Sequence, residues 1–209
     1  MNRRALLLAL ALSGVAAPAL AAPPVPAQPL SDEDKALVDR AAAYLDGLGQ
    51  VRGRFVQTDP RGSVSQGALY LNRPGKARFE YEGPASRLVV SDGHSVMVLD
   101  GRLKTFNRYP LGSTPLALFL QRHVRLDQKV TVTRVDRGPG SFMITARDGR
   151  HESQGEITLS FSENPVELKE WTILDGRGGR TSVRLSDLQP TSGLDPALFQ
   201  LQNPAGNAP

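Results

Sequence analysis

The sequence contains no cysteine and only three histidines among its 209 residues. Without cysteine the chain can form no disulfide bond, carries no thiolate nucleophile and cannot be lipid-anchored through an N-terminal cysteine. His94, His123 and His151 lie far apart in different predicted elements, and none has a ligand partner at metal-binding spacing. The sequence therefore predicts no metal, no cofactor and no catalytic thiol.

Recognisable catalytic motifs are also missing. No Gly-x-Ser-x-Gly sequence of a hydrolase nucleophile is present. Glu80 and Glu82 share a predicted strand face and could act as paired carboxylates, but alternating charges on a solvated strand face are far commoner. His94 follows a hairpin signal and is expected to be an exposed turn residue. We therefore expect no enzymatic activity.

Net charge is low as well. The formal charge is +4, from 25 basic and 21 acidic residues. Two of those basic residues, Arg3 and Arg4, lie in a segment that we expect to be removed, which leaves +2. The remaining basic residues are scattered, and no phosphate-binding loop accompanies them. We therefore expect no nucleic acid partner.

The longest apolar run is at the N-terminus. Residues 1–4 supply a positive region, residues 5–15 an apolar stretch, and Ala19-Leu-Ala21 a small-x-small cleavage site. The apolar run is too short to cross a membrane. We predict a signal peptide at 1–21, a proline-rich disordered leader at 22–30, and a single domain at 31–209 in the periplasm.

The stretch 67–100 predicts a four-stranded antiparallel meander. Leu69 and Leu71 alternate with polar or small residues, and so do Phe79 and Tyr81. Turn signals at Pro74-Gly75 and Asp92-Gly93 separate the strands. Alternation places each of these pairs on one face of the sheet, although it does not tell which face points inward.

Two segments predict helices. The first begins at the N-cap Ser31, ends at 47–49 and has a common apolar face comprising Leu37, Ala41, Tyr44, Leu45 and Leu48. The second begins with Ser113 or Thr114 as N-cap and Pro115 at its first position, and continues with Leu116, Leu118, Phe119 and Leu120. Because it is apolar nearly all round, it needs cover on more than one side, from the core or from a ligand.

Further strands are predicted after residue 130, with no helix-length segment between them, so they must be antiparallel. They fall at 130–135, 142–146, 157–161, 168–174 and 181–188. The segment 103–109 is less regular, and a short helical turn is expected at 195–198. The expected fold is therefore mainly β: one strongly curved antiparallel sheet of about eleven strands whose concave face the helices cover. Such a sheet can leave an apolar cavity for a hydrophobic ligand, or it can be fully packed.

Several short stretches, in this order and spacing, make the chain resemble the LolA family of periplasmic lipoprotein carriers. They are RFVQ at 54–57, GALYLNRP at 67–74, FEY at 79–81, LVVSDG at 88–93, GSTPL at 112–116, and residues 185–199. The resemblance implies an incomplete, half-open β-barrel with a helical lid over a hydrophobic cavity. It also implies a monomeric, non-enzymatic chaperone that binds the acyl chains of lipoproteins as cargo. An inner-membrane ABC transporter would release these lipoproteins, and an outer-membrane acceptor would receive them.

The resemblance assigns roles to individual residues. Arg73, before the proline of the first turn, would couple lid closure to loading by binding lid carbonyls, a role that suits the donor fork of arginine. The lid residues would be Leu37, Leu45, Leu48, Leu116, Leu118, Phe119 and Leu120. The acyl cavity would be lined by Leu69, Leu71, Phe79, Tyr81, Ile157, Leu159, Phe161 and Trp171.

Alternative functions remain open at this point. A lipid- or glycolipid-binding module, or a sensory module on the same half-barrel, would use a similar cavity. An enzyme that acts on an acylated substrate is a third possibility. The sequence ends soon after residue 206, and we expect little length for the additional C-terminal strand and loop that some carriers have.

Overall fold

The computed structural model describes residues 30–83, 87–114, 116–120, 130–148 and 155–202. The expected signal peptide and most of the leader lie outside the described residues, as do Pro115, His123 and His151.

The described residues form one sheet of eleven antiparallel strands in the order β6-β5-β4-β3-β2-β1-β11-β10-β9-β8-β7. The strands are β1 (Gln50–Thr58), β2 (Val64–Asn72), β3 (Lys76–Tyr81), β4 (Leu88–Asp92), β5 (Ser95–Asp100), β6 (Thr105–Pro110), β7 (Val130–Gly138), β8 (Ser141–Asp148), β9 (Glu156–Glu163), β10 (Val166–Leu174) and β11 (Arg180–Pro190). Strand β1 joins two meanders by pairing with both β2 and β11. Because β6 and β7 are the two edges, the barrel is not closed, as the sequence predicted.

Alternation along the strands sets the inner face of the sheet. In β2 and β3, Leu69, Leu71 and Phe79 are buried, and the residues between them are only partly covered. On the other side of β1, Val183 of β11 lies opposite Trp171 of β10, and both are buried. One hydrophobic cluster therefore spans both meanders on the concave face.

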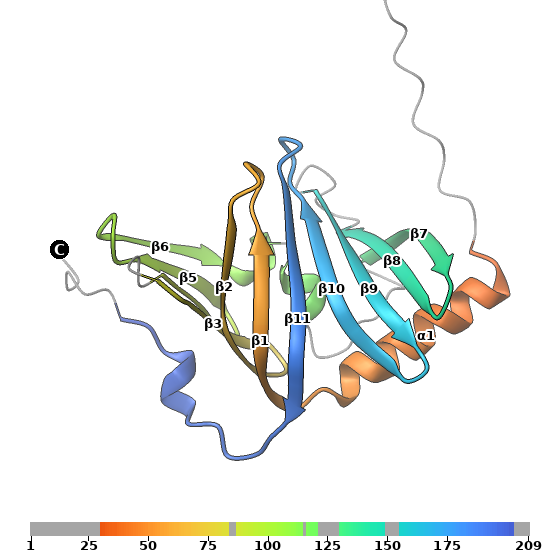
Figure 1. Cartoon of the computed structure of the whole chain (residues 1–209), viewed down its shortest axis with the longest axis horizontal. Helices are drawn as coiled ribbons and strands as arrows, with labels where there is room; N and C mark the ends of the chain where they lie inside the picture. Colours follow the sequence, from red (N-terminus) through yellow and green to blue (C-terminus); the bar gives the residue numbers. More distant parts are fainter. Residues whose placement is uncertain (1–29, 84–86, 115, 121–129, 149–154, 203–209) are drawn as a thin grey trace, which may run out of the picture.

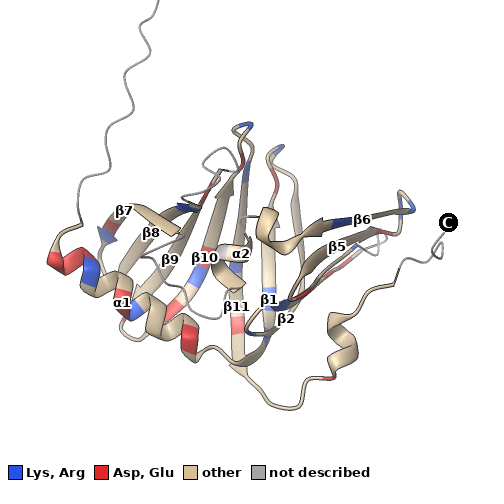
Figure 2. Cartoon of the chain, turned by 180° about the vertical axis from the view of Figure 1, so that it is seen from behind, with Lys and Arg blue, Asp and Glu red and all other residues tan. Residues whose placement is uncertain are grey.

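Two helices cover this concave face (Figures 1 and 2). Helix α1 (Asp32–Gly47) begins at Ser31, whose hydroxyl oxygen accepts a hydrogen bond from the backbone N–H of Asp34. Helix α2 (Leu116–Leu120) follows the 3-10 turn η1 (Leu111–Ser113). Helix α1 lies across the β7–β10 part of the sheet, whereas α2 lies between the two meanders. Both helices were expected from their apolar faces.

The last described segment crosses to the convex face. After β11, the 3-10 turn η3 (Pro196–Phe199) packs against β3 and β4. Phe199, Val90 and Met97 are buried there, outside the concave cluster. The guanidinium of Arg78 donates a hydrogen bond to the Leu198 carbonyl at 3.0 Å. The chain therefore builds a small second core behind the sheet.

The weakest strand signal in the sequence corresponds to an edge strand. The segment 103–109, whose pattern is less regular than that of the other strands, contains β6 (Thr105–Pro110), which pairs with β5 along its whole length. It is an edge strand, and five of its six residues are exposed. An exposed edge strand needs no apolar alternation, so the pattern used for the other strands could not detect it.

Candidate functional site

Helix α2 fills the interior of the half-barrel. The side chains of Phe119 and Leu120 are completely buried, and Ala117 is 7% exposed. Phe119 stacks on Trp171, with ring centroids 5.1 Å apart and 27° between the ring planes. Trp171 in turn makes an edge contact with Phe79 at 6.0 Å. The sheet therefore buries α2, as a helix that is apolar on nearly all sides requires.

The structure brings the predicted lining residues together. Seven of the eight are buried in the concave cluster, and Tyr81 packs against it. They come from both meanders: Leu69, Leu71, Phe79 and Tyr81 from β2 and β3, and Ile157, Leu159, Phe161 and Trp171 from β9 and β10. Their inward orientation, which alternation alone left open, follows from this burial.

Most predicted lid residues belong to the same cluster. Leu37, Leu45, Phe119 and Leu120 are buried in it, and Leu48 and Leu116 pack against it. The side chain of Leu118 lies outside the described part of the chain. The two helices and the sheet therefore share one hydrophobic interior.

Arg73 lies where the two helices meet the sheet. Its backbone N–H donates a hydrogen bond to the carbonyl of Gly49, two residues beyond the end of α1, and the N–H of Gly75 donates one to the carbonyl of Leu120 in α2 at 2.7 Å. The guanidinium carbon lies 5.8 Å from the centre of the Phe119 ring. Burial lowers the pKa of Arg73, and the charge of Asp46 on α1 opposes this shift. The 73–75 turn thus contacts both helices at once.

Helix α1 is held by a buried apolar face and an exposed polar one. Tyr44 makes an edge contact with Phe161 at 6.2 Å, and burial raises the pKa of its hydroxyl. On the outer side, Arg137 of β7 pairs with Glu33 and Asp34 at 2.6 and 2.7 Å. Exposed ion pairs of this kind contribute little to stability, because water and salt screen them. Apolar contacts therefore hold α1 on the sheet.

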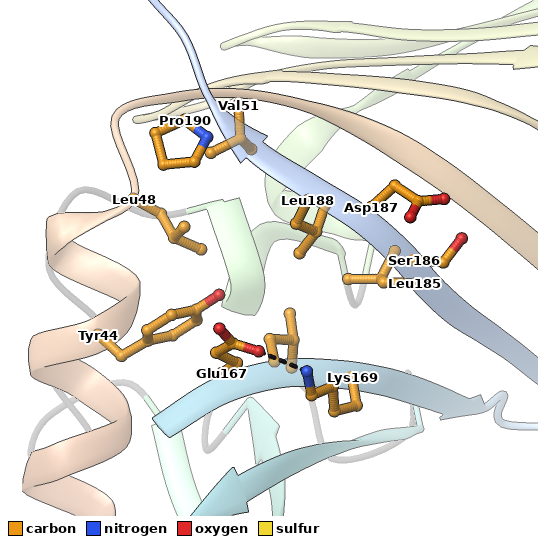
Figure 3. Close-up of a pocket in the computed structure, with 11 residues that line it drawn as sticks. Tyr44, Leu48, Val51, Glu167, Lys169, Leu185, Ser186, Asp187, Leu188 and Pro190 are labelled. Carbon is orange, nitrogen blue, oxygen red and sulfur yellow. Dashed lines mark hydrogen bonds and ion pairs between the residues drawn. The ribbon is translucent and has the colours of Figure 1, made fainter. Parts of the chain in front are cut away.

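A cavity of about 350 Å³ opens beside the C-terminal half of α1 (Figure 3). Tyr44 of α1 and its C-cap residue Leu48 form one wall, and Leu185 and Leu188 of β11 form the opposite wall. The ion pair between Glu167 and Lys169 lies at its edge. The other lining residues are Val51, Leu168, Ser186, Asp187 and Pro190. This volume is within the range of small-ligand sites, about 300–1,000 Å³.

Sequence reasoning missed most of this cavity, because only Leu48 had been assigned a functional role. The break in alternation near Asp187 explains the omission. Asp187 has φ 54°, and the pairing of β1 with β11 shifts register beside it, so Leu188 points inward where alternation places Asp187. Gly53 of β1 faces this bulge, and a Cβ there would lie 2.7 Å from Leu188 Cδ2. The sequence signal for this bulge was a glycine in one strand, opposite an aspartate-leucine pair in the neighbouring strand.

The described residues contain no group of three or more histidine, aspartate or glutamate side chains that could hold a metal ion. Glu82 is paired with Arg54, and Glu80 with Arg78, so the two carboxylates do not form a catalytic pair. His94 is exposed after the β4–β5 turn. No helix in the described part of the chain is both long and apolar enough to cross a bilayer.

Comparisons with known proteins agree with this architecture. The chain is 30% identical to the outer-membrane lipoprotein carrier protein of Methylobacillus flagellatus over 81% of its own length and 86% of that protein. It is also 30% identical to the protein of the same name from Methylococcus capsulatus, over 80% and 84%. A crystal structure of an uncharacterised conserved protein from Thermus thermophilus shares the fold, with a TM-score of 0.50, 10% identity and coverage of 84% and 98%. The sequence model of the family described as outer membrane lipoprotein carrier protein LolA matches residues 46–202 of this chain. The chain thus belongs to the LolA family of outer membrane lipoprotein carrier proteins.

Proposed function

We propose that this protein is a periplasmic carrier that binds the acyl chains of lipoproteins released from the inner membrane and delivers them to an acceptor at the outer membrane. Membership of the LolA family and the names of the relatives support the lipoprotein cargo. The predicted signal peptide supports the periplasmic location.

The observation that carries this proposal is the position of Phe119. Its ring occupies the centre of the concave face, stacked on Trp171, although α2 spans only five residues. A helix this short has little stability of its own, so packing against the sheet holds it in place. An acyl chain offers the sheet the same kind of contact, and it can take the place of α2. In this proposal α1 and α2 form the lid, α2 is the part that the cargo displaces, and the structure represents the closed form.

The cavity beside α1 gives the acyl chain a starting point. Its inner walls include Leu168 and Leu185, which belong to the same hydrophobic cluster as Phe119. A chain that enters beside Tyr44 and Leu48 can therefore extend along the concave face by displacing α2. The predicted lining residues of β2, β3, β9 and β10 would then contact the cargo.

Arg73 acts as the lid-coupling residue in this mechanism. The 73–75 turn contacts the ends of both helices, and the Arg73 guanidinium lies over the Phe119 ring. When α2 leaves, the hydrogen bond from Gly75 to Leu120 and the contact with Phe119 are lost together. The turn thus links the position of α2 to the position of α1, the other helix of the proposed lid.

The strength of acyl binding explains why partner proteins are needed. Burying one methylene group is worth about 0.8 kcal/mol, so a chain of roughly a dozen contributes on the order of 10 kcal/mol. Spontaneous release into water would be slow. The carrier therefore receives its cargo from an inner-membrane ABC transporter and passes it directly to an outer-membrane acceptor, and it acts as a monomer without catalysing a reaction.

Release of lipoproteins from spheroplasts tests the proposal. Purified protein added to spheroplasts is expected to bring newly made lipoproteins into the soluble fraction, and mass spectrometry of the protein from periplasm should find them bound. Bovine serum albumin, which binds acyl chains without specificity, serves as the control for passive extraction. No release above this control would contradict the carrier function, and recovery of a glycolipid instead would favour the alternative of a lipid-binding module.

A further inference from the structure

Three hairpin turns at one end of the sheet share an Asp-x-Arg sequence in which the aspartate accepts hydrogen bonds from its own turn. The β1–β2 turn reads Asp59-Pro-Arg-Gly62, the β10–β11 turn reads Asp175-Gly-Arg-Gly178, and the β5–β6 turn begins Asp100-Gly-Arg102. Because alternate turns of an antiparallel meander lie at the same end of the strands, all three belong to one end of the sheet. The triplet Asp-Gly-Arg also occurs at 148–150, which extends beyond the described residues.

The first two turns fold alike. Asp59 Oδ1 accepts hydrogen bonds from the backbone N–H groups of Arg61 and Ser63, and Asp175 Oδ1 accepts them from Arg177 and Gly179, all at 2.8–2.9 Å. Gly62 and Gly178 have φ of 79° and 82°. In the third turn, Asp100 Oδ1 accepts from the N–H groups of Arg102 and Leu103. Each aspartate is thereby occupied by its own turn.

Each of these turns presents an arginine to solvent. Arg61, Arg102 and Arg177 are exposed, and within the described part of the chain none of their side chains forms an ion pair. This differs from Arg54, Arg134 and Arg184 on the strands, each of which pairs with an acidic side chain. Figure 2 shows basic residues at the ends of these hairpins.

Around these three turns the described residues carry a small excess of positive charge. The three aspartates offset the three arginines, but Lys104 and Arg180 are exposed beside the same turns. Arg87 lies here too, at 3.2 Å from Asp100 Oδ2. Hydrogen bonds from backbone N–H groups lower the pKa of Asp100 and Asp175, so both remain ionised but directed at the backbone.

An exposed aliphatic side chain accompanies each arginine. Val64 follows the first turn and is 68% exposed, Leu103 lies within the third turn and is 59% exposed, and Leu174 precedes the second turn and is 38% exposed. Half of the large hydrophobic residues that are exposed in the described part of the chain therefore lie at this one end. We call these three hairpin ends, with Arg61/Val64, Arg102/Leu103 and Arg177/Leu174, the hairpin rim.

We propose that the hairpin rim binds the surface of a membrane that contains anionic phospholipids. The arginines would contact lipid phosphates, and the aliphatic side chains would enter the interface beside them. The repetition of one chemistry favours a membrane over a protein. A specific protein partner presents different chemical groups at different points of its surface. A lipid surface presents the same chemistry to all three hairpin ends. In Figure 1 the β1–β2 and β10–β11 hairpin ends lie at the top of the molecule and the β5–β6 end lies at its left, because the sheet twists between them.

The rim is well separated from the lid. Strand β2 runs from Val64 at the rim to Asn72 beside Arg73, a distance of about 27 Å at 3.4 Å per residue. A protein held by the rim would therefore keep the 73–75 turn, α2 and the cavity beside α1 away from the lipid surface. These parts would remain accessible to a protein that hands over or receives cargo.

Sedimentation with lipid vesicles tests this proposal. The chain without its predicted signal peptide is expected to bind vesicles of 30% phosphatidylglycerol and 70% phosphatidylethanolamine at low salt, and not vesicles of phosphatidylcholine. Each arginine near such a surface raises the membrane partition coefficient about fivefold. The variant R61Q/R102Q/R177Q should therefore bind the anionic vesicles about 100-fold more weakly. The variant V64S/L103S/L174S should bind about 10-fold more weakly at unchanged charge.

The matched control is R108Q/R134Q/R184Q, which removes the same charge from exposed arginines elsewhere on the sheet. It should bind within about fivefold of the unmodified protein, and circular dichroism should show that all variants are folded. An equal loss of vesicle affinity in the rim and control variants would mean that net charge alone drives binding, and it would overturn the proposal. Absence of binding to anionic vesicles would also overturn it, and rim-dependent binding to an acidic membrane protein alone would replace the lipid with a protein surface. Because the vesicles carry no lipoprotein, the result is independent of the carrier function.

Discussion

The ring of Phe119 in α2 stacks on the indole of Trp171 in β10 at 5.1 Å, and both side chains are buried. This contact joins α2, which we propose to be part of the lid, to the part of the sheet that would hold an acyl chain. Exchange of Phe119 for cargo would keep the concave face covered in both states. Neither state would then expose a large apolar surface to water, which suits a carrier that has to cross an aqueous compartment.

Replacing Phe119 with alanine should strengthen acyl binding. Deleting a buried phenylalanine ring costs about 3–5 kcal/mol, and in this position the loss falls mainly on the closed lid. Cargo that no longer has to displace the ring should bind about 10-fold or more tightly. Titration with a fluorescent fatty-acyl probe measures the affinity, and urea denaturation measures the free energy of unfolding.

The control for F119A is F199A. Phe199 is equally buried but lies on the convex face, away from α2. F199A should lower the free energy of unfolding without raising acyl affinity. If both variants bound the probe as the unmodified protein does, the lid role of α2 would be wrong.

Trp171 should report cargo binding directly. It is the only tryptophan in the chain and is 2% exposed. Displacement of Phe119 changes the environment of one indole face, so the emission should change in a saturable manner as a non-fluorescent fatty acid is added. In F119A the change should be smaller, because the stacked ring is already absent. If calorimetry showed that the fatty acid binds but the tryptophan emission did not change, the cargo would bind away from Trp171.

Much of the fold could be predicted because one face of each inner strand is buried. Leu69 and Leu71 in β2, and Phe79 in β3, alternate with partly exposed residues, and this period identifies both the strand and its inner face once burial is known. The first helix was equally clear, since Ser31 caps a run with a single apolar face. Local patterns of this kind depend on neighbours that are close in sequence.

The rest depends on contacts that are distant in sequence. Leu188 lines the cavity only because a bulge opposite Gly53 reverses the alternation of β11, and the two residues are far apart along the chain. The position of Arg73 against Phe119 likewise depends on how α2 enters the half-barrel. Family resemblance, rather than residue pattern, drew attention to Arg73.

Changing Arg73 to lysine should loosen the lid. A lysine keeps the charge, but its compact ammonium group cannot lie flat over the Phe119 ring as a guanidinium does. We expect faster hydrogen exchange at the amide of Gly75, which donates to Leu120, and an acyl affinity about three- to tenfold higher. R78K is the matched control, since Arg78 is also largely buried but binds Glu80 and Leu198 on the convex side. Unchanged exchange at Gly75 in R73K would argue against the coupling role.

Tyr81 should make stability fall at high pH. Burial raises the pKa of its hydroxyl from 10.0 to about 12, although Arg87 and a hydrogen bond to Gln57 oppose the shift. Because the folded pKa lies above the unfolded one, this contribution is complete below pH 10 and is lost between about pH 10 and 12. The loss is about 3 kcal/mol at most.

Denaturation of Y81F at several pH values measures this contribution. The phenylalanine variant should lose less stability over the same pH range, and the difference between the two proteins separates Tyr81 from Tyr44, whose pKa burial also raises. At pH 7 the variant should lose about 1 kcal/mol with the hydrogen bond to Gln57. Parallel pH curves for the two proteins would refute the assignment.

Replacing Leu188 with tryptophan should block cargo entry. The larger side chain would extend into the cavity of about 350 Å³ between α1 and β11, where there is space for it. Stability should therefore fall by less than the roughly 1–3 kcal/mol typical of overpacking in a filled core. Affinity for the acyl probe should fall at least 10-fold. V56W, on the exposed outer face of β1, adds the same ring without reaching the cavity and should bind normally. If L188W bound the probe as tightly as V56W, the acyl chain would enter without using this cavity, and the path along Leu168 and Leu185 would have to be abandoned.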